Sequence, residues 1–330
     1  MDWNSGMSEY HVAILGGGSV GLCLAAHFAK AGARVTLLVR GASVPAFAND
    51  PVRIDGALGD HECAPGVITA VDAANPTDAV LASDALIPTV KAYDLADALK
   101  PLAAAGYASP LLLLQNGVGS AETARAVMGP DVPVYSSTMM IGMARTAPTH
   151  MTVTGQSGPI LCGTLLGDDE TPLQALLAVA QRGFVPMQHD PTIRETVYFK
   201  LLFNSCMNPT GALTGQTYGA LLENPDSRAL ITDLAEETQA AYAAAFGYRP
   251  AESAEHYVDK ILSGIVFPKA QAHQSSMFQD LVAGRQTEID VLNGAVIRLA
   301  EAQGLPATRH RVIEQLIKAR EATARQTAQA

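Results

Sequence analysis

Several polar side chains stand in otherwise apolar or small-residue stretches of this sequence, where a polar group is costly unless it meets a partner. They are Asn116, Lys200, Asn204, Asn208 and Glu288. A lysine in such a place can act as a cationic donor beside a carbonyl oxygen that gains negative charge. Partial burial would also lower its pKa toward useful proton donation. These residue types indicate an enzyme that acts on a small polar substrate.

Three of these residues recur every fourth position, at Lys200, Asn204 and Asn208. Helical spacing places them on one face of a helix. Pro209 is expected to bend or end that helix just beyond Asn208. The alternative is that Asn204 caps a neighbouring loop and that Lys200 extends its amine to solvent.

A glycine-rich turn near the start of the chain predicts a dinucleotide site. It consists of Gly16, Gly17, Gly18, Ser19, Val20 and Gly21. In this pattern the first glycine permits a tight turn, the second lets the backbone approach a pyrophosphate, and the third lets helix and strand pack closely. The anion then rests on the amides at the helix N-terminus. The alternative is a glycine turn with a purely structural role.

Arg40, at the end of the second expected strand, indicates which dinucleotide is bound. Enzymes that use NAD usually place an acidic residue there to accept from the ribose 2′-hydroxyl, but here Arg40 precedes Gly41. An arginine can pair with a 2′-phosphate instead, so NADP(H) is the predicted cofactor and FAD is disfavoured. The alternative is an arginine that is merely solvated.

The elements around these residues begin with an apolar strand from His11, an amphipathic stretch to Lys30 and a second strand over 35–39. This order predicts a βαβ unit. Further strand-like runs cover 85–90, 111–114, 134–140, 151–154 and 160–162. Alternating elements predict an α/β fold with a Rossmann-type, doubly wound and mostly parallel sheet.

Strand signals end near residue 190, and Ala- and Leu-rich helical patterns follow. Helices are expected over 192–207, 226–246, 251–263, 270–283, 286–303 and 308–325. We therefore predict an NADP-binding Rossmann domain over 1–190, with 1–10 as a disordered lead-in, and an all-helical substrate and catalytic domain over 191–330.

Composition excludes several function classes. The chain of 330 residues has 32 acidic and 22 basic residues, a net charge of −10, which disfavours binding to nucleic acid or to an anionic membrane. No stretch approaches the ~20 apolar residues that a membrane-spanning helix needs. The four cysteines and the other candidate ligands have no metal-binding spacing, so no metal site is expected. A cytoplasmic location fits best.

Five separated motifs, in order, resemble those of the ketopantoate reductase (2-dehydropantoate 2-reductase) family. They are the glycine turn; Thr89-Val90-Lys91-Ala92; Leu114-Gln115-Asn116-Gly117; Lys200-Leu201-Leu202-Phe203-Asn204 with Asn208-Pro209; and Ser276-Met277-Phe278-Gln279-Asp280 followed by Thr287-Glu288-Ile289-Asp290 and Asn293-Gly294. The resemblance runs from His11 to about Arg320.

The resemblance implies a role for each matching residue, with the active site in a cleft between the two domains. Lys200 would donate the proton to the ketone oxygen, and Glu288 would lie where cofactor and substrate meet. Substrate carboxylate and hydroxyl groups would bind Asn204, Asn208 and Ser276. The nicotinamide end of NADPH would lie beside Lys91 and Asn116, and Gly142 would add a backbone contact.

Each of these residues also has a plainer interpretation. Lys91 could be a solvated lysine at a strand end, Asn116 a turn former and Ser276 a helix cap. Glu288 could be a surface charge near Arg285 or Lys269.

The chain also departs from the family at one position. Some family members bring a further substrate-binding asparagine where the alignment places Tyr218 here. This departure bears on the identity of the substrate.

The sequence as a whole predicts NADPH-dependent reduction of 2-dehydropantoate to pantoate, with a small 2-oxo acid as substrate. One alternative is a reductase or dehydrogenase of another 2-oxo or 3-hydroxy acid. Another is a sensor that binds NADPH without catalysis, although such a protein would not need Lys200 together with Glu288. The helical domain could form a homodimer.

Overall fold

A computed structural model describes residues 9–329, and the chain divides into two compact units. The N-terminal unit runs up to Gln115 and continues over Ser120–Arg194. The helical unit consists of Asn116–Gly119 and of all residues from Glu195 onward. The lead-in expected over 1–10 lies outside the described residues except for Glu9 and Tyr10, and the Tyr10 carbonyl accepts from the Arg34 amide (3.0 Å).

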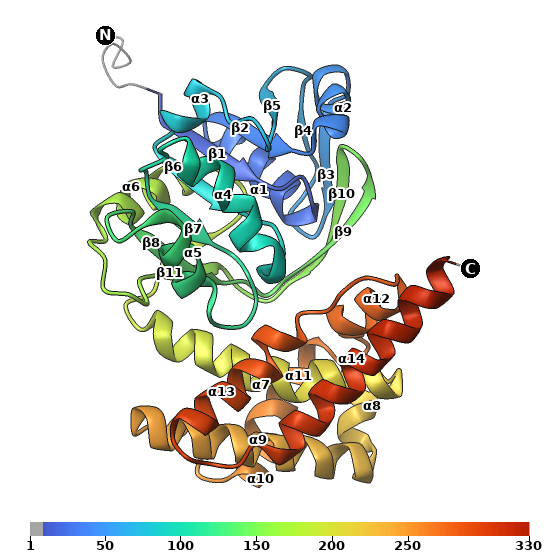
Figure 1. The fold of residues 1–330 in the computed structure, drawn as a ribbon. Coiled ribbons are helices and arrows are strands. Elements are labelled where there is room, and N and C mark those ends of the chain that lie inside the picture. Colours follow the sequence, from blue (N-terminus) through green and yellow to red (C-terminus); the bar gives the residue numbers. More distant parts are fainter. Residues whose placement is uncertain (1–8, 330) are drawn as a thin grey trace. The chain divides into compact units, whose positions relative to one another are not determined.

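The N-terminal unit is built on an eight-stranded sheet (Figure 1). In spatial order its strands are β12 (Met187–His189), β11 (Ile160–Gly163), β8 (Val134–Thr138), β7 (Leu111–Leu113), β6 (Ala85–Pro88), β1 (His11–Leu15), β2 (Arg34–Val39) and β5 (Ile68–Asp72). Neighbouring strands are parallel except for the antiparallel pair β8 and β11. Strand order reverses at β1, which lies between β2 and β6, and in such sheets ligands bind at this point.

Both faces of this sheet are buried, which explains why β1 is apolar along its whole length. Val12 and Ile14 join a core cluster with residues of α1 (Ser19–Lys30) and α6 (Thr171–Ala180). Ala13 and Leu15 join a separate cluster on the other face. That second cluster includes residues of α3 (Asp78–Leu81), α4 (Leu95–Ala104) and α5 (Ser120–Met128). The doubly wound sheet expected from the sequence is confirmed.

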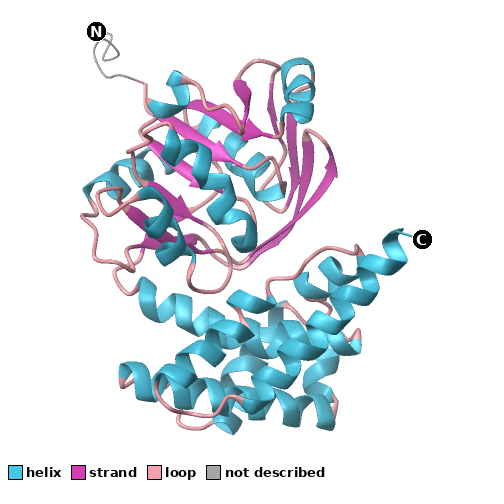
Figure 2. Cartoon of the chain, viewed as in Figure 1, coloured by secondary structure: helices cyan, strands magenta, loops and turns pink. Residues whose placement is uncertain are grey.

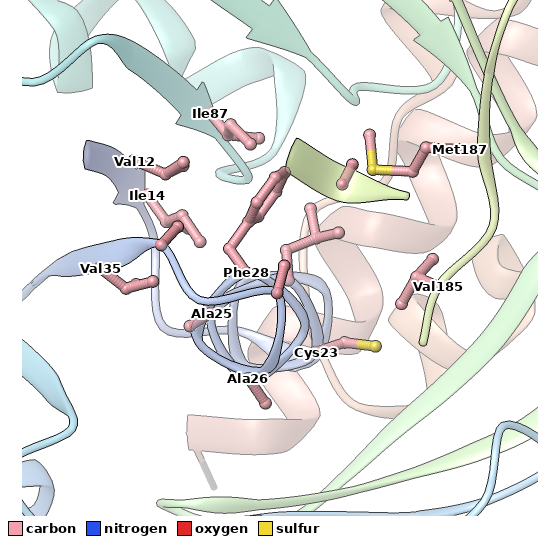
Figure 3. Packing of buried hydrophobic residues seen from close by; sticks show 14 of the residues in the cluster. Val12, Ile14, Cys23, Ala25, Ala26, Phe28, Val35, Ile87, Val185 and Met187 are labelled. Atoms are coloured by element: carbon pink, nitrogen blue, oxygen red, sulfur yellow. The ribbon is translucent and has the colours of Figure 1, made fainter. Parts of the chain in front are cut away.

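A second sheet of four strands was not expected. Its order is β4 (His61–Cys63), β3 (Val52–Gly56), β10 (His150–Gln156) and β9 (Ile141–Ala147). The strand expected over 151–154 therefore belongs to this smaller sheet. Helix α1 packs against both sheets, and Figure 3 shows Phe28 of α1 within the shared core cluster.

Three shorter elements complete the N-terminal unit. They are the 3-10 turns η1 (Gly41–Ser43) and η2 (Ala92–Asp94) and the helix α2 (Val44–Asn49).

Within the part of the chain described, all strands belong to the N-terminal unit, and the helical unit consists of helices and turns (Figure 2). Its elements are α7 (Ile193–Thr214), α8 (Tyr218–Glu223), α9 (Pro225–Phe246), α10 (Ala254–His256), the π-helical turn η3 (Tyr257–Leu262), α11 (Ser263–Lys269), α12 (Ser276–Val282), the 3-10 turn η4 (Ile289–Val291), α13 (Asn293–Ala302) and α14 (Thr308–Gln329). No helix of residues 9–329 is both long enough and apolar enough to cross a bilayer.

Helix α7 continues through Pro209 to Thr214, so the expectation that it could end just beyond Asn208 was wrong. Proline lacks the N–H that would bond the carbonyl four residues earlier, here that of Ser205. The Asn293 side chain supplies the missing donor, because its Nδ2 lies 3.0 Å from the Ser205 oxygen. A contact from α13 thus replaces the lost helical hydrogen bond.

Two expected helices are shorter than the pattern suggested. The helix expected over 270–283 begins only at Ser276, because Ser275 caps it by accepting from the Phe278 amide (3.1 Å). The preceding carbonyls of Gln271 and His273 instead accept from the amides of α8. The helix expected over 286–303 is divided into η4 and α13.

Candidate active site

The glycine turn after β1 has the geometry that each glycine position requires. Gly16 has a φ of 118°, which favours glycine, and its amide donates to the Leu38 carbonyl (2.9 Å). A Cβ on Gly21 would lie 1.8 Å from the Gly16 carbonyl oxygen, so α1 can approach the turn only with glycine there. Thr89, whose role the sequence did not reveal, donates its hydroxyl to that same oxygen (3.0 Å).

The middle of the turn leaves room for an anion. Gly18 caps α1, and a Cβ built on it would meet nothing within 4 Å. Ser19 and Val20 lie in the first turn of α1, which carries no acidic residue. No carboxylate there would repel a phosphate bound at the helix N-terminus. Gly17 packs against Val39, since its Cβ would lie 2.7 Å from Val39 Cγ1. The turn therefore fits the pyrophosphate of a dinucleotide.

Arg40 follows β2 and is exposed, at the start of the 3-10 turn η1. A carboxylate that sequence reasoning missed lies nearby, because a Cβ on Gly41 would be 3.2 Å from Asp72 Oδ2. Asp72 ends β5, which pairs with β2 in register with Val39, so the sheet brings it close to the end of β2. Asn75 Nδ2 donates to the same Asp72 oxygen (3.2 Å).

The two other residues expected at the cofactor lie at different places in the N-terminal unit. Lys91 follows β6, at the same sheet edge as the glycine turn, because β6 pairs with β1 in parallel. Gly142 lies on β9 in the smaller sheet, where it pairs with Gly155. A Cβ on Gly142 would lie 2.4 Å from Thr154 Oγ1, so packing within that sheet accounts for this glycine.

In the helical unit, Lys200, Asn116 and Glu288 form a chain of hydrogen bonds. Lys200 Nζ donates to Asn116 Oδ1 (2.9 Å), and Asn116 Nδ2 donates to Glu288 Oε2 (3.1 Å). An ammonium only donates and a carboxylate only accepts, so the amide orientation between them is fixed. Asn116 therefore couples the cation to the anion.

Burial controls the charge of Lys200. Desolvation lowers the pKa of Lys200 from the ordinary value of 10.5 to about 8, and the nearby Glu288 carboxylate opposes this shift. Such an amine is largely protonated at neutral pH and yet releases its proton more readily than a solvated lysine. This is the property that a proton donor needs.

Neighbouring groups hold Glu288 and Asn116 in place. The backbone amide and hydroxyl of Thr287 both donate to Glu321 Oε1 (2.7 and 2.5 Å). Gly117 has a φ of 80°, and a Cβ there would lie 2.2 Å from the Val291 carbonyl oxygen. The short segment Asn116–Gly119 can therefore lie directly against the turn that carries Glu288.

The remaining expected substrate residues differ in exposure. Asn204 and Asn208, on α7, are only 8% and 5% exposed. Asn208 Oδ1 accepts from the Tyr218 hydroxyl (2.6 Å). Ser276 is exposed at the first position of α12, whereas its neighbour Ser275 is buried and caps that helix.

The contacts of Glu288 and Asn116 differ from those of a surface charge and a simple turn former. Arg285, the expected surface partner of Glu288, pairs with Asp280 (2.9 Å). Asn116 precedes a turn but also bonds two charged side chains. Both Asn116 and Glu288 thus take part in contacts that a surface turn would not provide.

Known proteins show the same two-part organisation. Residues 12–167 match the family model of ketopantoate reductase PanE/ApbA, and residues 192–321 match the model of the ketopantoate reductase PanE/ApbA C-terminal part. The 2-dehydropantoate 2-reductase of Aquifex aeolicus is 28% identical over 310 residues, which cover 93% of this chain and 96% of that protein.

Solved structures resemble the chain over nearly its whole length. A PanE/ApbA family ketopantoate reductase from Ralstonia eutropha JMP134 has a TM-score of 0.81 and 28% identity, covering 95% of this chain and 99% of that one. A D-mandelate dehydrogenase solved with NADH and anilino(oxo)acetate has a TM-score of 0.83, but its 20% identity indicates the fold alone.

A doubly wound sheet with a dinucleotide-binding turn, joined to a helical unit with a half-buried lysine of lowered pKa, defines a nucleotide-dependent oxidoreductase of two units. The family models that match both units identify the family within this class. The chain belongs to the ketopantoate reductase family, and it is therefore an NADP-dependent oxidoreductase.

Proposed function

We propose that the chain catalyses the NADPH-dependent reduction of 2-dehydropantoate to pantoate. The observation that carries the proposal is the hydrogen-bonded chain from Lys200 through Asn116 to Glu288, with an ammonium whose pKa burial lowers to about 8. The names of the relatives support this substrate, because the Aquifex aeolicus protein is a 2-dehydropantoate 2-reductase.

In the proposed binding mode, the N-terminal unit holds the cofactor. The amides after Gly18 receive the pyrophosphate, and Arg40 pairs with the 2′-phosphate. We assign Lys91, Asn116 and the Gly142 backbone to the nicotinamide end. NADPH supplies the hydride to C2 of the 2-oxo acid when it is bound.

Lys200 then completes the reduction. Its Nζ donates a proton to the C2 oxygen as the hydride reaches the carbon, which gives the 2-hydroxy acid and leaves a neutral amine. Asn116 accepts one Lys200 N–H and so holds the amine in place. Glu288 acts through Asn116 and favours the charged form of the amine. Asn204, Asn208 and Ser276 complete the proposed substrate site.

The first test measures loss of reduced-nicotinamide absorbance with 2-dehydropantoate. In Lys200→Ala we expect kcat to fall about 100- to 1000-fold, as when one preorganised donor is removed at other sites, while NADPH affinity stays within about twofold. Lys260→Ala is the matched control, since Lys260 is an exposed lysine of the same unit. Equal losses of turnover and NADPH affinity in Lys200→Ala would show that the lysine is structural.

We also propose a cytoplasmic location and a homodimer. The location is supported by the four cysteines, which are all buried and unpaired by disulfides. The dimer is supported by Val312 and Leu316, which are exposed apolar residues one turn apart on α14. Cell fractionation and light scattering of the purified protein test these two points.

A further inference from the structure

Tyr218, the first residue of α8, is held firmly by its neighbours. Its side chain is 5% exposed. The ring packs edge-on against Phe203, with centroids 5.6 Å apart, and at a tilt against His273, at 5.1 Å. The Tyr218 amide also donates to the His273 carbonyl (2.9 Å). The direction of the phenol is therefore fixed by its surroundings.

The Tyr218 hydroxyl orients the Asn208 side chain. Burial raises the pKa of Tyr218 well above its usual range, so the phenol stays protonated. A buried O–H needs an acceptor, and among residues 9–329 the acceptor within reach is Asn208 Oδ1, at 2.6 Å. The amide oxygen is thus held by Tyr218, and the Nδ2 protons point away from it.

The backbone of Asn208 is held as well. Ser275 Oγ donates to the Asn208 carbonyl oxygen (3.0 Å), and Ser275 is itself fixed as the cap of α12. With the amide oxygen engaged, the Asn208 side chain can offer only N–H donors to a ligand. A ligand atom that bonds this side chain must therefore be an acceptor.

The position of Asn208 along α7 determines which part of a ligand it can reach. It lies eight residues beyond Lys200, about 12 Å along the axis at the helical rise. The long lysine side chain covers part of this distance, so a ketone at the Lys200 amine and a group at Asn208 belong to different parts of the substrate.

We propose that Tyr218 is a specificity-determining positioning residue, which holds Asn208 as an N–H donor and so selects 2-oxo acids with an oxygen acceptor at the end remote from the ketone. This inference rests on the proposed function, because it takes the polar face of α7 as the substrate site. A terminal hydroxyl or carboxylate oxygen satisfies the donor, whereas an alkyl terminus leaves it unpaired.

The test compares two substrates that differ in one oxygen atom. They are 2-dehydropantoate and 3,3-dimethyl-2-oxobutanoate, which has the same carbon skeleton without the hydroxyl. We expect the protein to prefer 2-dehydropantoate in kcat/KM by about 10-fold or more, as for one buried hydrogen bond. In Tyr218→Phe the preference should fall to about twofold through KM, with kcat and NADPH affinity nearly unchanged.

Tyr257→Phe is the matched control. The Tyr257 hydroxyl is buried in the same unit and has no hydrogen-bond partner among residues 9–329, so its removal should leave the preference unchanged. A loss of preference in both variants would assign the effect to general packing and overturn the role of Tyr218.

A double-mutant cycle tests whether Tyr218 acts through Asn208. In an Asn208→Ala background, Tyr218→Phe should change KM by less than about twofold, because the group that it orients is gone. Independent effects of the two substitutions would overturn the proposal.

Failure of the proposed function can be told apart from failure of this inference. A protein that reduces neither acid contradicts the proposed function alone. The side-chain amide of Asn208 then reports on Tyr218 by NMR, its signal being identified by its absence in Asn208→Ala. We expect Tyr218→Phe to shift that signal, and an unshifted signal would overturn the role of Tyr218.

Discussion

At the scale of single residues, Lys200 joins two requirements that usually conflict. In the proposed role of proton donor, the amine must be shielded enough to lose its proton readily and charged enough to donate it. Burial supplies the first condition, and the Glu288 carboxylate, bonded through Asn116, supplies the second. Burial therefore lowers the pKa of the side chain to about 8, without removing its charge at neutral pH.

The lowered pKa of Lys200 predicts a specific pH dependence. In the proposed mechanism reduction uses the protonated amine, so kcat/KM should be level below about pH 8 and should fall about tenfold per pH unit above it. Oxidation of pantoate uses the neutral amine and should rise through the same range. Steady-state rates in both directions measure this. A reduction rate that stays level up to pH 10.5, the ordinary lysine value, would contradict the proposed role.

Arg40 carries the predicted preference for NADPH. Replacing it with aspartate removes a charge-assisted contact to the 2′-phosphate and adds repulsion, so NADPH affinity should fall about 10- to 100-fold while NADH affinity falls less. Fluorescence titration of each cofactor measures the change. Arg182→Asp serves as control, because Arg182 is an exposed arginine of the same unit. An unchanged ratio of the two affinities would exclude Arg40 as the reader.

Only part of the candidate site could be read from residue types and spacing. The shared face of Lys200, Asn204 and Asn208 follows from helical periodicity. The bond from Asn116 to Glu288 joins residues 172 positions apart, and no local pattern encodes such a contact. The bond from Tyr218 to Asn208 was hidden as well, because it joins side chains of two different helices.

At the scale of elements, α7 depends on a polar network in an otherwise apolar core. His310 Nε2 faces the Leu234 carbonyl (3.0 Å), which only accepts, so this nitrogen carries the proton. His310 Nδ1 then accepts from Asn293 Nδ2 (3.0 Å), whose other proton reaches the Ser205 carbonyl. Burial lowers the pKa of His310 to about 4, so the network stays neutral at physiological pH.

This network predicts how α7 tolerates its internal proline. Asn293→Ala leaves the Ser205 carbonyl and the His310 ring nitrogen without their donor, which should lower the free energy of unfolding by about 2–4 kcal/mol. Adding Pro209→Ala restores a backbone N–H that can bond Ser205, so part of this loss should return. Denaturant titrations of the single and double variants measure both changes. No recovery in the double variant would refute the compensation.

The sequence predicted most elements well and failed where tertiary contacts decide. Buried parallel strands such as β1 can be recognised in the sequence as continuous apolar runs. Strand β4 has only three residues, and β9 is largely exposed and lacks an apolar run, so the smaller sheet was missed. The effect of Pro209 was also mispredicted, because the compensating donor, Asn293 Nδ2, comes from a helix distant in the sequence.

At the scale of the whole molecule, the two units have separate apolar cores, and the chain passes between the units three times. The change of pattern near residue 190 indicated the last of these crossings. The earlier excursion over Asn116–Gly119 is too short to alter any composition window. The close approach of Gly117 to Val291, and the bonds of Asn116 to Lys200 and Glu288, show why those four residues belong with the helices.

This excursion limits how the protein can be recombined with its relatives. A chimera joined at residue 195 takes Lys200 and Glu288 from one parent but Asn116 from the other, so the amide between them is inherited separately from both charges. The segment Asn116–Gly119 must be exchanged together with the C-terminal part if Lys200 and Glu288 are to keep the asparagine of their own parent protein between them. The smallest inheritable version of this site is therefore discontinuous in the gene.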